Sequence, residues 1–128
     1  MKVSCPKVSF KDDRGIIKDL LVKEPLDAIT VISSAKGAVR GNNYHKDTIQ
    51  WVYLMSGFLT SLTQLEGDSI VSQTIRPGEL LKTDVLEKHT LIAEEDSEFL
   101  VLTRGPRGGD SYEEDTYRLD KPLNYNAG

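Results

Sequence analysis

Short runs of alternating apolar and polar residues, separated by turn-forming residues, constrain this chain more than any other feature. Such alternation over a few residues is expected of β-strands with one buried face. The runs lie at residues 16–22, 29–34, 39–45, 50–55, 58–65, 70–75, 79–82, 89–93 and 98–103. No long helical pattern interrupts them, and Gly67-Asp68 between two runs predicts a tight hairpin. The chain is therefore predicted to be all-β, as a sandwich or barrel.

The composition fits one domain and narrows the possible partners. With 128 residues the chain can bury one core. Its net charge is −4, with acidic and basic residues interspersed, so no basic stripe suited to nucleic acid or anionic membrane is present. The sequence holds no apolar stretch of the length of a membrane helix or signal peptide, and its single Cys5 cannot form an internal disulfide. These features predict a cytoplasmic protein.

The character of the sequence changes after Arg104. Residues 105–109 contain three glycines and a proline, and a polar, acidic segment follows. Leu119, Pro122 and Leu123 give this segment enough apolar surface to dock. We predict one domain at residues 1–104 and a tail at 105–128 that packs on that domain or on a partner subunit.

The most specific site signal is a polar motif that starts at residue 40. It reads Arg40-Gly41-Asn42-Asn43-Tyr44-His45-Lys46 and is followed by Gln50 and Gly57. Positions 43 and 45 alternate along a predicted strand, so their side chains should point the same way. Further on, Pro77-Gly78 favours a type II turn, and His89 follows it.

These residues resemble the two sequence motifs of the cupin family. In cupins a Gly is followed by two His separated by one residue, a Glu and a second Gly, and a later Pro-Gly turn precedes another His. Here Asn43 occupies the position of the first His, His45 that of the second, and Gln50 that of the Glu. The scaffold of the motif is retained, and two of its ligand positions carry amides.

Within cupins, the resemblance is to the branch that modifies sugar nucleotides. The dTDP-4-dehydrorhamnose 3,5-epimerases and dTDP-4-keto-6-deoxyhexose 3,4-ketoisomerases carry an early aromatic-x-Asp-x-Arg-Gly element, which residues 10–15 resemble. They also carry an Arg-Gly-x-His-x-His-Lys element, which residues 40–46 resemble. The resemblance implies an antiparallel cupin jelly-roll barrel and an epimerase or ketoisomerase that acts on a nucleotide-linked keto sugar, in polysaccharide or deoxysugar biosynthesis.

The same resemblance implies roles for individual residues. His45 and His89 are the predicted catalytic residues, because proton transfer beside a ketone needs a group whose pKa lies near the working pH. Asparagine cannot serve as such a base, so Asn43 departs from the family mechanism. Planar guanidinium groups suit phosphate, and amides suit sugar hydroxyls. The predicted substrate-binding residues are Arg40, Asn43, Gln50 and Arg14.

Two other functions stay open at this point. One is a non-catalytic cupin that binds a saccharide-like or carboxylate ligand, and the other is a metal-dependent cupin enzyme. No cofactor is expected, because the candidate ligand set has two imidazoles and two neutral amides but no anionic group. If a divalent ion binds, its ligands would be His45, His89, Gln50 and Asn43. A homodimer is predicted, with Trp51 and Tyr53 on an outward face that a second subunit covers.

Overall fold

The computed structural model describes residues 2–106 and 114–123, which form strands and turns but no helix. The first strands are β1 (Lys2–Ser4), β2 (Val8–Asp12), β3 (Gly15–Lys18), β4 (Ala28–Ser34), β5 (Val39–Tyr44) and β6 (Ile49–Ser56). The remaining strands are β7 (Leu59–Gln64), β8 (Val71–Ile75), β9 (Leu80–Thr83), β10 (Lys88–Ala93), β11 (Ser97–Arg104) and β12 (Tyr117–Arg118). The prediction of an all-β chain is confirmed. No helix in the described part of the chain is long and apolar enough to cross a membrane.

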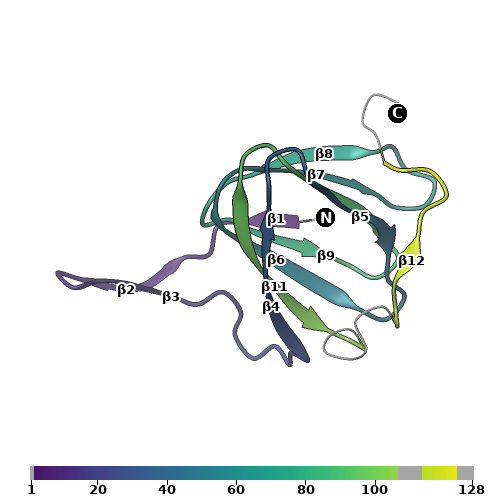
Figure 1. Ribbon diagram of the computed structural model, residues 1–128. Coiled ribbons are helices and arrows are strands. Elements are labelled where there is room, and N and C mark those ends of the chain that lie inside the picture. The colour runs from purple at the N-terminus through teal and green to yellow at the C-terminus, as the bar shows by residue number, and fades with distance from the viewer. Residues whose placement is uncertain (1, 107–113, 124–128) are drawn as a thin grey trace.

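Two five-stranded sheets face each other and form the body of the molecule (Figure 1). The first sheet has the order β1-β9-β6-β11-β4, and the second has the order β12-β5-β10-β7-β8. Every pair of neighbouring strands is antiparallel. The predicted hairpin around Gly67-Asp68 is confirmed, because it joins β7 to its partner β8.

The core lies between the two sheets because the inward side chains of both are apolar. Its buried members are Val52, Leu54, Leu59, Ile75, Leu81, Ala93, Phe99 and Val101. A fully buried side chain of this kind typically contributes about 1.5–3 kcal/mol relative to an exposed one. Three of its members, Val52, Phe99 and Val101, also line a cavity between the sheets.

Gly57 makes the tight connection between β6 and β7. Its φ is +96°, and a Cβ atom at this position would lie 2.2 Å from the Ser97 Oγ atom and 2.5 Å from the Asp96 carbonyl oxygen. Only glycine satisfies both constraints without displacing the neighbouring chain. The second glycine of the sequence motif therefore carries the chain from the first sheet to the second.

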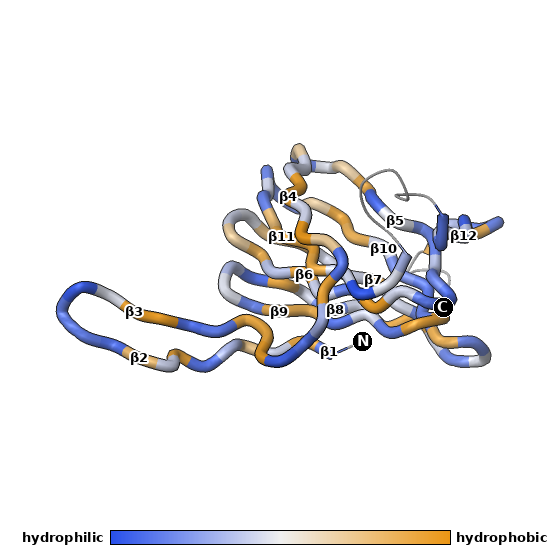
Figure 2. Tube along the Cα trace, turned by 90° about the horizontal axis from the view of Figure 1, so that it is seen from below, coloured by the Kyte–Doolittle hydropathy of each residue, from blue (hydrophilic) through white to orange (hydrophobic). Residues whose placement is uncertain are grey.

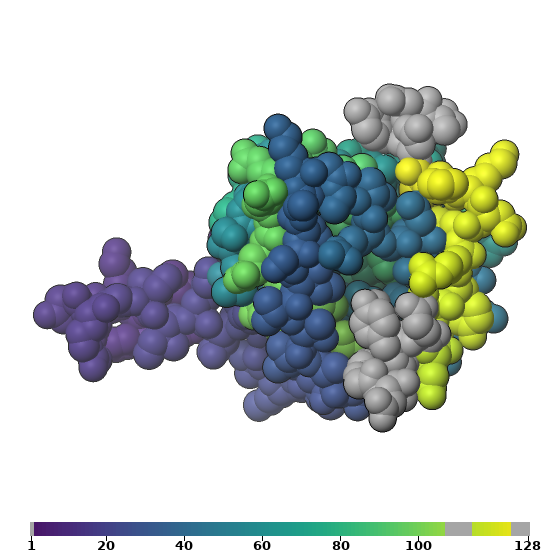
Figure 3. Space-filling view, viewed as in Figure 1, coloured from purple at the N-terminus to yellow at the C-terminus, as the bar shows by residue number. Residues whose placement is uncertain are grey.

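A hairpin of β2 and β3 projects from the body as an arm (Figures 1 and 3). Hydrophobic stretches run along it beyond the barrel, as Figure 2 shows. The predicted strand at 16–22 is wrong for residues 19–22, because the chain leaves the arm there and Leu21 packs on the outer face of the first sheet. The short strands β1, β2 and β12 were not predicted, because each has at most two apolar residues and so gives only a weak periodic signal.

Trp51 is already buried within the single chain. It lies on the outer face of the first sheet with Leu80 and Leu102, and Leu21 and Leu26 pack against this cluster. Its side chain is only 4% exposed. The prediction that a second subunit must cover Trp51 is therefore wrong, because the connection between β3 and β4 covers it.

The described part of the tail lies against the second sheet, on the side of the barrel opposite the arm (Figure 3). β12 pairs with β5, with Tyr117 opposite Tyr44 and Arg118 opposite Asn43. The Tyr44 and Tyr117 rings stack at a centroid distance of 5.3 Å. Farther along, Leu119 N donates to Asn42 O, and Leu123 N donates to the Asn42 Oδ1 atom.

Candidate functional site

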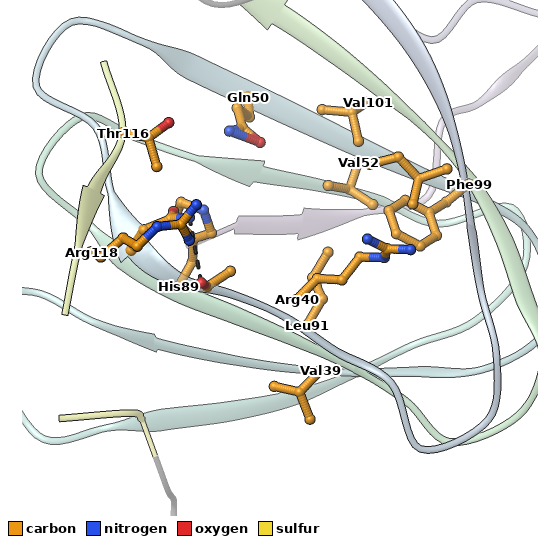
Figure 4. A pocket seen from close by; sticks show the side chains of 13 residues that line it. Val39, Arg40, Gln50, Val52, His89, Leu91, Phe99, Val101, Thr116 and Arg118 are labelled. Atoms are coloured by element: carbon orange, nitrogen blue, oxygen red, sulfur yellow. Dashed lines mark hydrogen bonds between the residues drawn. The ribbon is translucent and has the colours of Figure 1, made fainter. Parts of the chain in front are cut away.

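A cavity of about 310 Å³ opens between the two sheets (Figure 4). Its volume is at the lower end of the range of about 300–1000 Å³ that is usual for ligand pockets. One part of its wall is apolar and the other is polar. The lining residues are Ile32, Val39, Arg40, Gly41, Asn43, Gln50, Val52, His89, Leu91, Phe99, Val101, Thr116 and Arg118.

A bulge in β5 brings Arg40 and Asn43 to the same cavity. In a regular strand these residues would face opposite sides. Here the register against β10 shifts between His89, which pairs with Asn43, and Thr90, which pairs with Gly41. Gly41 and Asn42 have φ values of +100° and +55°, respectively. A Cβ atom on Gly41 would lie 2.8 Å from the His89 carbonyl oxygen, so glycine is required at this bulge.

The two arginines of the cavity give it a positive charge. Arg40 also joins the edges of the two sheets, since its Nε donates to the Ser34 Oγ atom at 2.7 Å and its Nη2 to the Ser33 carbonyl oxygen at 2.9 Å. Arg118 reaches the cavity from β12. The lining includes no aspartate or glutamate among the described residues. An anionic ligand is therefore favoured over a cationic one.

Two buried oxygens in the cavity wall have no hydrogen-bond partner among the described residues. They are the Asn43 Oδ1 and Thr116 Oγ1 atoms. The Asn43 side chain makes only a long contact, in which Nδ2 donates to Gly41 O at 3.4 Å. Burying such a group without a partner costs about 1–3 kcal/mol, so both atoms favour a polar ligand, and the Asn43 oxygen, which can only accept, favours one that brings a hydrogen-bond donor.

His45 is almost wholly enclosed, with 2% of its surface exposed, and it does not line the cavity. Its Nδ1 atom lies 2.7 Å from the Asp115 carbonyl oxygen, and its Nε2 atom lies 2.7 Å from Gln50 Nε2. Gln50 stands between this ring and the cavity. The tail is thus hydrogen bonded directly to the second histidine position of the motif.

His89 is the imidazole that lines the cavity (Figure 4). Its Nδ1 atom lies 3.2 Å from the Glu87 carbonyl oxygen, which can only accept a hydrogen bond. That contact places the proton of the neutral ring on Nδ1 and makes Nε2 the basic nitrogen. The His89 and His45 ring centroids are 5.1 Å apart.

Asp115 anchors the tail at the edge of the cavity. Its buried carboxylate accepts hydrogen bonds from Lys46 N at 3.1 Å, Asp47 N at 2.9 Å and the Thr48 Oγ1 atom at 2.7 Å. Burial raises the pKa of this carboxyl, but the bonds from Thr48, Asp47 and Lys46 outweigh burial, and the pKa is lowered overall. The residue that follows, Thr116, is thereby held in the cavity wall.

The structure thus gathers most of the predicted site residues but not all of them. Arg40, Asn43, Gln50 and His89 line one cavity, and His45 lies directly behind it. Arg14 does not belong to this cavity within the same chain, because it sits on the projecting arm and pairs with Asp12 at 2.7 Å. Sequence reasoning missed Thr116 and Arg118, since the apolar residues of the tail indicated docking but not which polar residues would face inward.

Metal-ligating side chains are not grouped in the described residues. Within residues 2–106 and 114–123, no three His, Cys, Asp or Glu side chains are placed so that they could hold a metal ion. Of the conditional ligand set, His45 is hydrogen bonded at both ring nitrogens. The expectation that no metal is needed stays a prediction.

Comparison with solved structures identifies the architecture. The chain superposes on the 3,4-ketoisomerase QdtA from Thermoanaerobacterium thermosaccharolyticum, a double mutant in complex with TDP, with a TM-score of 0.72 and 20% identity over 98% of this chain and 89% of that one. The fold is that of a cupin. The RmlC epimerase from Legionella pneumophila, in complex with dTDP-4-keto-L-rhamnose, gives a TM-score of 0.72 and 13% identity over 91% of this chain and 70% of the epimerase.

A third similar structure belongs to a longer protein. The capsular polysaccharide assembling protein CapF from Staphylococcus aureus matches with a TM-score of 0.65 and 19% identity. The match covers 88% of this chain but only 34% of the CapF chain, so this chain spans about a third of that protein. No family model and no curated protein sequence matches this chain. The predicted cupin jelly roll is confirmed as a fold.

Proposed function

We propose that this cupin binds a nucleotide-linked keto sugar and transfers a proton at a carbon next to the ketone. The observation that carries the proposal is the composition of the cavity wall. Arg40 and Arg118 supply positive charge for phosphate, Asn43 and Thr116 supply acceptors for sugar hydroxyls, and His89 supplies an imidazole. The reaction class is epimerisation or ketoisomerisation.

The ligands of structurally similar proteins support this choice of substrate class. The RmlC structure holds dTDP-4-keto-L-rhamnose, and a His-to-Asn mutant of QdtA holds TDP-4-keto-6-deoxyglucose. Both ligands join a diphosphate to a sugar with one ketone and several hydroxyls. The same combination of groups suits a cavity with two guanidinium groups and unpartnered acceptor oxygens.

We assign the proton-transfer role to His89 rather than to His45. His89 lines the cavity and has its Nδ1 hydrogen bonded to Glu87 O, so Nε2 is the nitrogen that can take a proton. His45 lies behind Gln50 and does not line the cavity. A positioned general base typically contributes about 10²–10⁴-fold to the rate.

Solvent exchange of the sugar protons tests this proposal. Wild-type protein incubated with dTDP-4-keto-6-deoxyglucose in heavy water should incorporate deuterium at the carbon next to the ketone, as measured by NMR. His89→Gln should lower that rate by about 100-fold or more. Lys88→Gln is the matched control, because Lys88 neighbours His89 in β10 but does not line the cavity, and its rate should stay at the wild-type level.

Non-catalytic binding is a second candidate function, and position 43 favours it. In the resembled enzymes this position carries a histidine, and asparagine cannot take up a proton. If the wild-type protein binds the nucleotide sugar but gives no exchange above buffer, binding without chemistry replaces the enzymatic proposal. Asn43→His would then be expected to create exchange where the wild-type protein shows none.

We also propose that the protein is a cytoplasmic homodimer held in part by the arm. Apolar side chains project from the arm into solvent, each about half exposed; they are Val8, Phe10, Ile16 and Ile17. An apolar surface of this kind on a monomer commonly marks an interface. Since Arg14 is remote from the cavity of its own chain, it can contribute to a site only in the second subunit.

Sedimentation velocity tests the dimer. The wild-type protein should sediment at about twice the monomer mass of 14.3 kDa. Ile17→Asp should shift it toward monomer, because a charge would replace an apolar contact, whereas Lys11→Asp on the same arm should leave a dimer. A wild-type monomer at micromolar concentration would rule out the proposed assembly.

A further inference from the structure

The Gln50 amide is held in one orientation by a chain of hydrogen bonds that begins in the tail. Gln50 lines the cavity and is buried, with 7% of its surface exposed. Its Nε2 atom lies 2.7 Å from His45 Nε2, and the other ring nitrogen of His45 lies 2.7 Å from the Asp115 carbonyl oxygen. The cavity wall, the buried ring and the tail are thus connected in series.

The chemistry of these groups fixes the direction of each bond. A backbone carbonyl can only accept, so the His45 Nδ1 atom must carry a hydrogen and donate to Asp115 O. In the neutral ring Nε2 then holds the lone pair and accepts from the Gln50 Nε2 group. The Gln50 amide nitrogen is therefore committed to His45, which leaves its Oε1 atom to face the cavity.

Figure 4 shows the Gln50 amide directed into the cavity from β6, across from His89. Its oxygen joins two other oxygens of the cavity wall, Asn43 Oδ1 and Thr116 Oγ1, which are buried and have no partner in the described part of the chain. Two amide oxygens can only accept, so this part of the wall calls for hydrogen-bond donors. Sugar hydroxyls supply donors, whereas a ketone oxygen does not.

We propose that His45 is a positioning residue, which holds the Gln50 oxygen toward the ligand so that the cavity selects the hydroxyl-bearing part of a nucleoside diphosphate sugar. The ketone of the substrate then faces the other part of the wall, where Arg40 and Arg118 carry donors. This inference rests on the proposed nucleotide-sugar function and adds the basis of its selectivity. In this proposal His45 acts by orienting the Gln50 amide and does not contact the sugar itself.

Two measurements test the selectivity. The affinities for dTDP and for dTDP-glucose are compared by calorimetry. Both ligands carry the same phosphates, and only dTDP-glucose carries a hydroxyl-bearing sugar. The wild-type protein should prefer dTDP-glucose, and His45→Leu should lower that preference by roughly two- to tenfold, the value of one hydrogen bond, without changing the affinity for dTDP. His45→Gln, which keeps one donor and one acceptor, should restore part of the preference.

The tautomer of His45 is tested separately, in the wild-type protein and without ligand. Two-bond ¹H–¹⁵N correlation spectra at neutral pH should show a neutral ring with the proton on Nδ1. A ring protonated on Nε2, or on both nitrogens, would reverse the Gln50 amide and overturn the inference. An equal loss of affinity for dTDP and dTDP-glucose in His45→Leu would also overturn it, because the change would then be structural.

The two proposals fail in distinguishable ways. If neither dTDP nor dTDP-glucose binds the wild-type protein, the nucleotide-sugar function and the selectivity both fall, whatever the tautomer. If both ligands bind equally well, the function survives and the selectivity does not. If His45→Leu does not fold, the comparison is made with Gln50→Leu, which removes the oxygen itself and should reduce the preference by the same factor.

Discussion

Replacement of Asp115 by asparagine should destabilise the protein markedly, although it changes only one atom. The Asp115 carboxylate accepts from three donors, which are Lys46 N, Asp47 N and the Thr48 hydroxyl. An amide offers one acceptor oxygen and one NH₂ group in the same space. The Thr48 hydroxyl can rotate to accept from that NH₂, but the Asp47 N–H cannot, so at least one donor loses its partner.

The magnitude follows from the type of bond that is lost. A hydrogen bond to a charged group contributes about 1.5–3 kcal/mol, and a buried donor without a partner costs about 1–3 kcal/mol. Asp115→Asn should therefore lower the free energy of unfolding by about 2–3 kcal/mol. This is a large fraction of the roughly 5–15 kcal/mol that stabilises a typical domain, but it should leave the protein folded at 25 °C.

Urea denaturation followed by tryptophan fluorescence measures this change, because the chain has a single, buried Trp51. The control is Asp120→Asn, the same chemical change at an exposed residue of the same tail, which should alter stability by less than about 0.5 kcal/mol. A shift in the midpoint at constant slope reports a change of stability alone. If Asp115→Asn is no more destabilising than Asp120→Asn, the tail is not anchored as the structure indicates.

Three further predictions concern the same region. The folded pKa of Asp115 is lowered below its usual value of 3.8. The contribution of Asp115 to stability should therefore be present at neutral pH and be lost as the pH falls through the folded pKa. A plot of unfolding free energy against pH should accordingly be flatter below about pH 5 for Asp115→Asn than for the wild type. Gly41→Ala should lower the melting temperature and ligand affinity together, because its φ is +100° and its Cβ would lie 2.8 Å from the His89 carbonyl oxygen; an unchanged calorimetric melting curve would contradict the bulge. Arg118→Gln should weaken dTDP binding by about tenfold and reduce its dependence on salt, as expected for the loss of one phosphate contact, whereas Arg76→Gln outside the cavity should change neither.

The sandwich could be predicted from the sequence because each strand carries a local signal. Alternating runs indicate the strands, Gly57 marks the turn between two of them, and Gly67-Asp68 marks a hairpin, all through interactions among near neighbours. Arg76 and Glu79 bond across the predicted Pro77-Gly78 turn, where Gly78 has a φ of +90°. Of the two strands of the arm only β3 was predicted, because these strands pair with each other outside the core and bury little apolar surface.

The site was less predictable, because its geometry depends on an irregularity and on a distant segment. Strict alternation along residues 39–45 places Asn43 and His45 on one face of the strand, whereas Arg40 was predicted at the site only from the family resemblance. The bulge at Asn42 brings Arg40 into the cavity wall, and His45, beyond the end of β5, turns behind Gln50. Thr116 and Arg118 are separated from the motif by about 70 residues, and the tail reaches the site through the pairing of β12 with β5. No local sequence pattern predicts such a long-range pairing.

Asn43 both departs from the cupin motif and holds one of the two buried oxygens of the cavity wall that have no hydrogen-bond partner among the described residues. A buried acceptor without a partner lowers stability, so the Asn43 oxygen is maintained at a cost to the ligand-free fold. A hydrophobic residue of similar size would remove that cost, and Asn43→Leu should accordingly keep or raise the melting temperature while it weakens binding of dTDP-glucose more than that of dTDP. Such a side chain, which is needed for binding but not for folding, is expected at a ligand site. If Asn43→Leu instead destabilised the fold and left binding unchanged, the amide would have a structural role, and the assignment of this wall to sugar hydroxyls would be wrong.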